Sequence, residues 1–551
     1  MNNASLDQAI HSAIATGFLW DTSEFDSIDT SNISFSASFA RRKSYIIKKY
    51  SGASSLRAFK KAVGIAAIII ASALSLGILT VMAVEPLRES AYNLITEWVS
   101  HQTSAEPAET TPPVSQAPQT PNTPPTPPPD VNYSSGLSFA ISYDGTYYTV
   151  TGEGSCIDKA IYIPPTFNGL PVKVIGKDAF NRSRADNIFV PEGIERIEEY
   201  AFWGCKADYI QLPQSLTYIG NWAFDGCSNI EQIYLSDSIT FIGMGAFNYC
   251  DTLKSITLPS SLASIEQSVF GNCFDIVDIV IPDSVTYIGS DAFSGCRALE
   301  TVTFGSSIIK IGSSAFLNCE NLRNAYLPDS VEIIEQGAFV NCKRMTAVSF
   351  GKDLKTIESG AFGGCNKLSS ITIPESVEFI GSDAFSDCKS LKSIDLSSCG
   401  ITSIESRAFA GCYKLAQIIL PQRLESIGSG AFDGCGKLSE LNLPHGLKTI
   451  GGLAFNNCRS LVKLSFPDGV ETFGDDFINA CTDLTEITIG KGVIQIGSVV
   501  PENLPKLKTI KFRGTEEEWK TIAFTEGNAL LTADVIFNVQ DSMIPPTVET
   551  D

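Results

Sequence analysis

Residues 253–273 read LKSITLPSSLASIEQSVFGNC, and this unit recurs with small changes over most of the chain. Leu253, Ile256 and Leu258 follow an L-x-x-I-x-L pattern, which predicts a short strand with alternating inward side chains. Pro259 ends that strand because proline lacks the amide donor that a sheet needs. The remaining inward positions of the unit are expected to be Leu262, Ile265, Phe270 and Cys273.

The pair Ala-Phe, or a near variant of it, marks the period of the repeat. The spacing is 22, 23 or 24 residues, and the phenylalanines are Phe180, Phe202, Phe224, Phe247, Phe270, Phe293, Phe316, Phe339, Phe362, Phe385, Phe409, Phe432, Phe455 and Phe477. Such a period, with Leu and Ile at set offsets, is typical of leucine-rich repeats. No single unit can bury its apolar face alone, so the units must stack. We expect a mainly β solenoid of the α/β leucine-rich-repeat type, on the order of 60 Å long at about 4.8 Å per coil.

Thirteen of the fifteen cysteines keep the same period, and Cys156 and Cys399 do not. Twelve of them follow a repeat phenylalanine by three residues, and Cys481 follows by four. Disulfides are one interpretation for an extracellular chain, whereas a zinc site would need paired ligands such as C-x₂-C, which do not occur. The spacing of one thiol per coil favours buried free thiols. The expected inward ladder includes Phe202, Cys205, Phe224, Cys227, Phe293, Cys296, Phe316, Cys319, Phe362 and Cys365.

The charge of the chain is strongly acidic, at -21 over 551 residues. This excess disfavours nucleic acid and anionic lipid as partners of the bulk domain. Only residues 1–61 are basic, with eight Lys or Arg against five Asp or Glu. The three histidines are His11, His101 and His445, and His445 lies in a Leu-Pro-His-Gly turn. With no histidine cluster and no nucleophile–histidine set, we expect no enzyme, no metal site and no cofactor.

One stretch can cross a membrane. Residues 62–84 form an uncharged run that, at about 1.5 Å per residue, is long enough for a bilayer core of about 30 Å. The basic residues before it place the N-terminus in the cytoplasm and residues 85–551 outside, by the positive-inside rule. A cleaved signal peptide ending at Ala83 is the alternative, but such peptides are about 15–30 residues long and this run begins only after residue 61.

The regions flanking the repeats have their own compositions. Residues 107–130 contain ten prolines, which indicates an extended polyproline-type stalk. Residues 85–105 are expected to form a juxtamembrane helix, with continuation of the span as the alternative. The predicted organisation is a cytoplasmic segment at 1–61, a transmembrane helix at 62–84, the juxtamembrane helix at 85–105, a Pro-rich linker at 106–134, an N-terminal cap at 135–178, repeats at 179–506, a C-terminal cap at 507–540 and a tail at 541–551.

Ligands of a repeat protein usually bind side chains that point out of its strands. These outward positions are mostly small and polar here, with tyrosines at only a few coils. Tyrosine is favoured in binding sites, although it is also favoured in any strand. The candidate ligand-binding residues are Tyr209, Gln211, Gln232, Tyr234, Asn324 and Tyr326, and the corner formed by Tyr209 and Tyr234 is the expected hot spot.

Three phrases resemble the BspA-like, or Treponema pallidum type, family of leucine-rich-repeat proteins. They are DGTYYTVTG…IPPTFNGLPVKVIGKDAF, the repeated LP-x-S-[VL]-x-x-IG-x-x-AF-x-x-C, and the closing FRGTEEEW. The resemblance covers residues 136–539 and implies a solenoid on a bacterial surface that adheres to host matrix, host cells or other bacteria. It offers no catalytic residue. The departures from the motif are Ser183 in the first cysteine position, Val269 and Asp476 in place of alanine, and Gly305 and Gly351 in place of the proline at the strand end.

The N-terminal part carries a second resemblance. Residues 34–98 are similar to an anchoring module of Firmicute surface and anti-sigma-like proteins. Together the two resemblances imply a single-pass protein of a bacterial cell membrane, with the repeats outside. Its expected function is adhesin-like binding of an extracellular protein or glycan, such as host matrix or another cell. The alternative is a transmembrane sensor whose residues 1–61 contact a cytoplasmic regulator.

Overall fold

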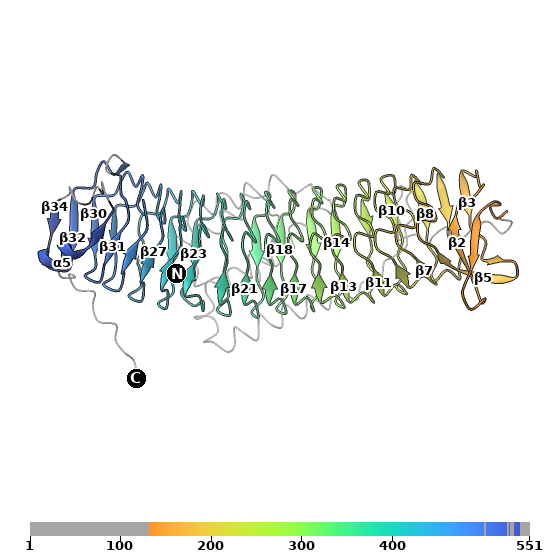
Figure 1. The fold of residues 1–551 in the computed structure, drawn as a ribbon, viewed down its shortest axis with the longest axis horizontal. Coiled ribbons are helices and arrows are strands. Elements are labelled where there is room, and N and C mark those ends of the chain that lie inside the picture. The colour runs from red at the N-terminus through yellow and green to blue at the C-terminus, as the bar shows by residue number, and fades with distance from the viewer. Residues whose placement is uncertain (1–131, 501–502, 526–527, 529, 531–533, 540–551) are drawn as a thin grey trace, which may run out of the picture. The chain divides into compact units, whose positions relative to one another are not determined.

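A computed structural model describes residues 132–500, 503–525, 528, 530 and 534–539. These residues form a solenoid in which each coil crosses two parallel β-ladders and then turns back (Figure 1). In the part of the chain that is described, no helix is long and apolar enough to cross a membrane. The span expected at residues 62–84 and the stalk at 107–130 lie outside the described residues.

The first ladder, which we call the long-strand ladder, contains the L-x-x-I-x-L segments. Its strands are mostly three residues long because the proline or glycine that follows ends them. They are β3 (Ala160–Tyr162), β6 (Asn187–Phe189), β8 (Tyr209–Gln211), β10 (Gln232–Ile233), β12 (Ser255–Ile256), β14 (Asp278–Val280), β16 (Thr301–Thr303), β18 (Asn324–Tyr326), β20 (Ala347–Ser349), β23 (Ser393–Asp395), β25 (Gln417–Ile419), β28 (Lys463–Ser465), β30 (Glu486–Ile489), β32 (Thr509–Phe512) and β34 (Asp534–Ile536).

The second ladder, which we call the short-strand ladder, lies where most units read x-Ile-Gly or x-Ile-Glu, with phenylalanine in place of isoleucine in β29 and β33. Its strands are β5 (Leu170–Ile175), β7 (Arg196–Ile197), β9 (Tyr218–Ile219), β11 (Phe241–Ile242), β13 (Ser264–Ile265), β15 (Tyr287–Ile288), β17 (Lys310–Ile311), β19 (Ile333–Ile334), β21 (Thr356–Ile357), β22 (Phe379–Ile380), β24 (Ser403–Ile404), β26 (Ser426–Ile427), β27 (Thr449–Ile450), β29 (Thr472–Phe473), β31 (Gln495–Ile496) and β33 (Ala523–Phe524). In register, each isoleucine pairs with the residue at the same place in the next coil, as Ile288 does with Ile311.

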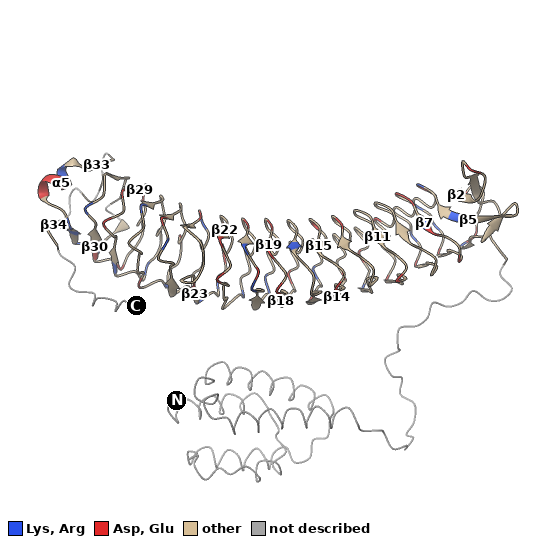
Figure 2. Ribbon diagram, turned by 90° about the horizontal axis from the view of Figure 1, so that it is seen from below, with Lys and Arg blue, Asp and Glu red and all other residues tan. Residues whose placement is uncertain are grey.

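The two ladders differ in continuity. The short-strand ladder runs unbroken from β13 to β22, whereas between β10 and β25 the long-strand ladder is divided into separate pairs of strands. In Figure 2 the solenoid is bowed, and β14, β18 and β23 lie along its outer side, where the arc is longer.

The third side of each coil is the Ala-Phe turn, which also stacks in register. The amide of Phe293 donates to the carbonyl oxygen of Ala315 in the next coil at 2.8 Å, and that of Gly295 donates to Leu317 at 2.7 Å. Successive phenylalanine rings from Phe180 to Phe455 stack with centroids 4.9–5.8 Å apart. This offset stack forms a continuous aromatic column through the core.

The last repeat differs from the sequence-based register. The amide of Phe455 donates to the carbonyl oxygen of Phe477 at 2.8 Å, whereas in the coil before, Phe432 donates to Ala454. Phe477 therefore occupies the alanine position, and the fully buried Ile478 takes the phenylalanine position. The expectation that Phe477 is the repeat phenylalanine, and that Asp476 replaces alanine, was wrong. The observed register keeps a distance of 23 residues between Phe455 and Ile478. It also places Cys481 three residues after Ile478, the same spacing that separates each preceding cysteine of the column from its repeat phenylalanine.

Both ends of the solenoid are closed by irregular elements. At the N-terminal end, β1 (Ser138–Ile141) pairs antiparallel with β2 (Tyr148–Gly152), and β4 (Thr166–Phe167) pairs antiparallel with β5. Phe139 stacks on Phe167 there with centroids 4.1 Å apart. At the C-terminal end, helix α5 (Glu516–Thr521) begins with a capping box between Thr515 and Glu518. Its Trp519 covers Phe512 at 5.1 Å, so the open end of the core is shielded from water.

Candidate interaction surfaces

The candidate residues at the N-terminal end lie close together. Tyr209 and Gln211 lie on β8, Gln232 lies on β10, and Tyr234 follows it. The hydroxyl of Tyr234 donates to Oε1 of Gln232 at 3.2 Å. Burial raises the pKa of Tyr209, and Tyr234 adds a smaller electrostatic contribution in the same direction. The structure thus brings four of the six candidates into one patch.

The other two candidates are separate from that patch. Asn324 and Tyr326 lie on β18, several coils further along the long-strand ladder. Tyr326 is 62% exposed and Asn324 is half-buried. The structure therefore does not join these two residues to the Tyr209 and Tyr234 corner.

Two aromatic residues that the sequence analysis did not select extend the corner. Tyr162 on β3 stacks on Phe189 on β6 with centroids 4.4 Å apart, and Phe189 lies 6.0 Å from Tyr209. We call Tyr162, Phe189, Tyr209 and Tyr234 the N-terminal aromatic corner. The sequence could have indicated them, because Tyr162 in the cap and Phe189 in the first repeat occupy the same outward strand position as Gln211.

Polar atoms at this corner are incompletely paired. Within the described residues, the Tyr209 hydroxyl and Oε1 of Gln211 are enclosed by neighbours and have no hydrogen-bond partner. Such a group costs about 1–3 kcal/mol, and native structures keep few of them. These two atoms can therefore pair with groups of a ligand, as can similarly enclosed atoms elsewhere in the described chain, such as Oδ1 of Asn366.

The short-strand ladder carries a second outward row that the sequence analysis overlooked. Tyr218 stacks on Phe241 with centroids 5.1 Å apart, and the guanidinium of Arg196 lies 3.8 Å from the Tyr218 ring centroid. Further along, Lys310 lies 5.5 Å from the ring of Tyr287. In the sequence this row can be found as the residues that directly precede the Ile-Gly or Ile-Glu pairs. Toward the C-terminus this row becomes small and hydroxylated, with Ser403, Ser426, Thr449 and Thr472.

The predicted ladder residues all face the core. Phe202, Cys205, Phe224, Cys227, Phe293, Cys296, Phe316, Cys319, Phe362 and Cys365 are fully buried. The cysteines of the described chain are free thiols. Burial raises the pKa of Cys205 to about 11 and that of Cys296 to about 12, so these thiols stay protonated and unreactive at neutral pH. No cluster of histidine, cysteine or carboxylate side chains among the described residues could hold a metal ion.

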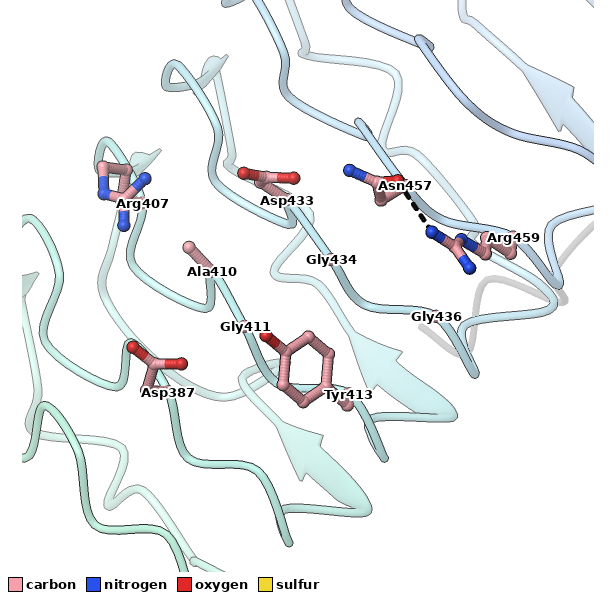
Figure 3. A pocket seen from close by; sticks show the side chains of 10 residues that line it. All are labelled: Asp387, Arg407, Ala410, Gly411, Tyr413, Asp433, Gly434, Gly436, Asn457 and Arg459. Atoms are coloured by element: carbon pink, nitrogen blue, oxygen red, sulfur yellow. Dashed lines mark hydrogen bonds between the residues drawn. The ribbon is translucent and has the colours of Figure 1, made fainter. Parts of the chain in front are cut away.

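One hollow is present on the turn side of the C-terminal half, with a volume of about 570 Å³ (Figure 3). Glycines form its floor, and the ring of Tyr413 stands over them. Its lining residues are Asp387, Arg407, Ala410, Gly411, Tyr413, Asp433, Gly434, Gly436, Asn457 and Arg459. None of these residues was singled out from the sequence.

Comparison with known protein families identifies the repeat region as leucine-rich repeats. The family profile described as "BspA type Leucine rich repeat region" matches residues 173–300, 264–392 and 402–530. The chain belongs to the BspA-type leucine-rich-repeat family. The resemblance expected from the repeat motif is therefore confirmed. Leucine-rich-repeat solenoids of this family are typically binding scaffolds without enzymatic activity.

Three solved structures similar to this BspA-type chain come from bacteria. A leucine-rich repeat protein from Bacteroides ovatus is 22% identical over 74% of this chain and 99% of its own, with a TM-score of 0.48. A leucine rich cell surface protein from Faecalibacterium prausnitzii is 22% identical over 73% and 99%, with a TM-score of 0.37. The T. pallidum leucine-rich-repeat protein is 24% identical over 43% and 91%, with a TM-score of 0.28. No curated protein sequence matches the chain.

Proposed function

We propose that this protein is anchored in a bacterial cell membrane by residues 62–84 and binds an extracellular protein through its repeat solenoid. The membrane-anchored topology is supported by the uncharged run and its basic N-terminal flank. Protein binding is supported by membership of the BspA-type family and by the long regular surface that a solenoid offers.

The N-terminal aromatic corner is the observation that carries the proposal. It joins four aromatic side chains on neighbouring coils, with Tyr234 36% exposed and the others half-buried. Tyrosine offers a large contact area with few rotatable bonds and a polar tip, which suits it to protein interfaces. A partner that shifts the Tyr209 ring would also pair its hydroxyl, which is enclosed without a hydrogen bond. This gain would be made only in the complex.

Topology is tested first, on intact cells that express the full chain. External protease should release fragments of the repeat region while an antibody epitope placed in residues 1–61 stays protected. Protection of both regions, in cells whose wall has been removed, would contradict the outward orientation. Capture of a cytoplasmic protein by residues 1–61 would instead support the sensor function.

Binding is tested with the full-length chain on immobilised extracellular-matrix proteins. The double variant Tyr209→Ala/Tyr234→Ala should weaken binding at least tenfold, as expected for interface hot spots that each contribute about 2 kcal/mol. The matched control is Val280→Ala, which truncates an exposed side chain of the same ladder at a position that is not a binding candidate. Equal binding by the double variant and the control would show that the corner is not the binding site.

A further inference from the structure

The lining of the hollow on the turn side includes one glycine that the backbone does not require. Gly411 and Gly434 have φ of 72° and 76°, a region that disfavours other residues. Gly436 has no positive φ, and a Cβ built on it would meet nothing closer than 3.9 Å. A side chain would therefore fit at position 436 without strain.

Neighbouring coils show what this position usually carries. The residues at the same place, four after the repeat phenylalanine, are Lys343, Asn366, Lys389, Tyr413 and Arg459. In Figure 3 the missing side chain at Gly436 leaves open the space between Tyr413 and Arg459. The fold does not explain the glycine, whereas an occupant of the hollow would.

Charged groups around the hollow are already partly engaged, and the exposed Lys389 beside it lies 3.9 Å from Oδ1 of Asp387. Arg407 donates to Asp383 at 2.9 Å, and Arg459 donates to Asn457 at 3.5 Å. Asp433 accepts a hydrogen bond from Asn456 at 2.7 Å, which holds one carboxylate oxygen in place. Two carboxylates disfavour an anion here, and two guanidinium groups disfavour a metal cation. A neutral ligand rich in hydroxyl groups fits best.

We propose that this hollow binds a neutral saccharide. Tyr413 is 52% exposed, and Lys389 lies over its ring with Nζ 6.0 Å from the centroid. Once this exposed lysine turns away, the negative π face suits the C–H face of a pyranose. Asp387 and Asp433 accept hydrogen bonds from hydroxyls, while Asn457 and Arg459 donate to hydroxyl or ring oxygens. A volume of about 570 Å³ falls within the range of small-ligand sites, roughly 300–1,000 Å³. The site is separate from the N-terminal aromatic corner, so either can fail without the other.

The test uses the full-length chain and three probes: methyl β-glucoside, methyl β-galactoside and N-acetylglucosamine. Saturation-transfer NMR should show at least one of them binding with a Kd near 1 mM, a modest affinity in keeping with an open site. The strongest transfer should reach the C–H protons of one pyranose face. Gly436→Lys should lower the affinity at least tenfold. The melting temperature should stay unchanged, because Lys343 and Lys389 occupy the same place in other coils.

Two further variants separate the site from general effects. Tyr413→Ala should also lower affinity at least tenfold, whereas Tyr413→Phe, which keeps the ring, should retain binding within about threefold. Ser228→Lys adds a lysine at the same place in a distant coil and should leave sugar binding unchanged, although it removes the hydroxyl that accepts from Lys206 at 2.9 Å. Absence of transfer to all three probes, or binding that survives Gly436→Lys, would overturn the proposal.

Discussion

The thiol of Cys319 donates a hydrogen bond to the carbonyl oxygen of Phe293, one coil earlier, across 3.2 Å. The same bond recurs from Cys227 to Cys481, with distances of 3.1–3.4 Å. The cysteine column is therefore more than a row of small apolar groups. Each thiol fills a fixed volume and also links two successive coils.

Replacement of Cys319 by serine should lower the free energy of unfolding by roughly 1–3 kcal/mol. The shorter C–O bond draws the hydroxyl away from the Phe293 carbonyl, and its lone pairs are left buried without donors. Urea denaturation of the variant and the parent measures the difference. Cys319→Ala is the control, and serine should be at least as destabilising as alanine. A serine variant with the parent's midpoint would contradict this account of the column.

Stability should fall steeply in alkali. The folded-state pKa of Cys296 is about 12, well above the ordinary value of 9.0, because burial penalises the thiolate. Above pH 9 the unfolded thiol loses its proton while the folded one keeps it, so the stabilisation present below pH 9 is lost toward pH 12. Each thiol then contributes a slope of up to about 1.4 kcal/mol per pH unit. The urea midpoint should drop between pH 8.5 and about 10.5, and a flat profile would contradict buried thiols.

Two positions in neighbouring turns should respond oppositely to mutation. Leu453 and Gly430 both lie two residues before a repeat phenylalanine, with φ of 57° and 61°. A non-glycine residue there costs about 1–2 kcal/mol. Leu453→Gly should raise the free energy of unfolding by roughly 0.5–1 kcal/mol, since the leucine is 42% exposed and packs little. Gly430→Ala should lower it by about 1 kcal/mol. Thermal melts of both variants test the pair, and shifts of the same sign would be evidence against backbone strain.

The C-terminal cap should protect its own end of the solenoid first. Trp519→Ala should cost about 3–5 kcal/mol locally, because the indole covers Phe512 and packs 5.3 Å from Phe524. Nearest-neighbour coupling confines the loss to adjacent coils. Hydrogen exchange should therefore quicken in β30 and β32 but not in β6 and β8. Phe139→Ala at the other cap should produce the reverse pattern, and uniform loss along the chain would argue against independent caps.

Much of the core could be inferred from the sequence because every coil repeats the same apolar offsets. Phe293, Cys296 and their equivalents are buried as expected, since a shared period forces equivalent residues to stack. The one register error, at Phe477, arose where two apolar residues adjoin and composition cannot decide between them. The position of Cys481 identifies the correct register, because its distance of 23 residues from Cys458 equals the repeat length of the preceding coils.

The candidate binding surface was only partly accessible from the sequence. Outward positions on the long-strand ladder follow from the alternation of a strand, so Tyr209 and Tyr234 could be selected. The contact of Tyr209 with Phe189, which stacks on Tyr162, depends on how the cap pairs with the first repeat. The hollow beside Gly436 depends on side chains from successive coils, so no single unit of sequence reveals it.

The sequence by itself determined the period, the direction of the inward side chains and the family, because these follow from local spacing. Only the tertiary structure decided the bow of the solenoid, the enclosed hydroxyl of Tyr209 and the open space at Gly436. Each of these depends on the distance between neighbouring coils. That distance is set jointly by strand pairing, ring stacking and the hydrogen bonds of the turns. All three join neighbouring coils, so the sequence of a single repeat does not determine it.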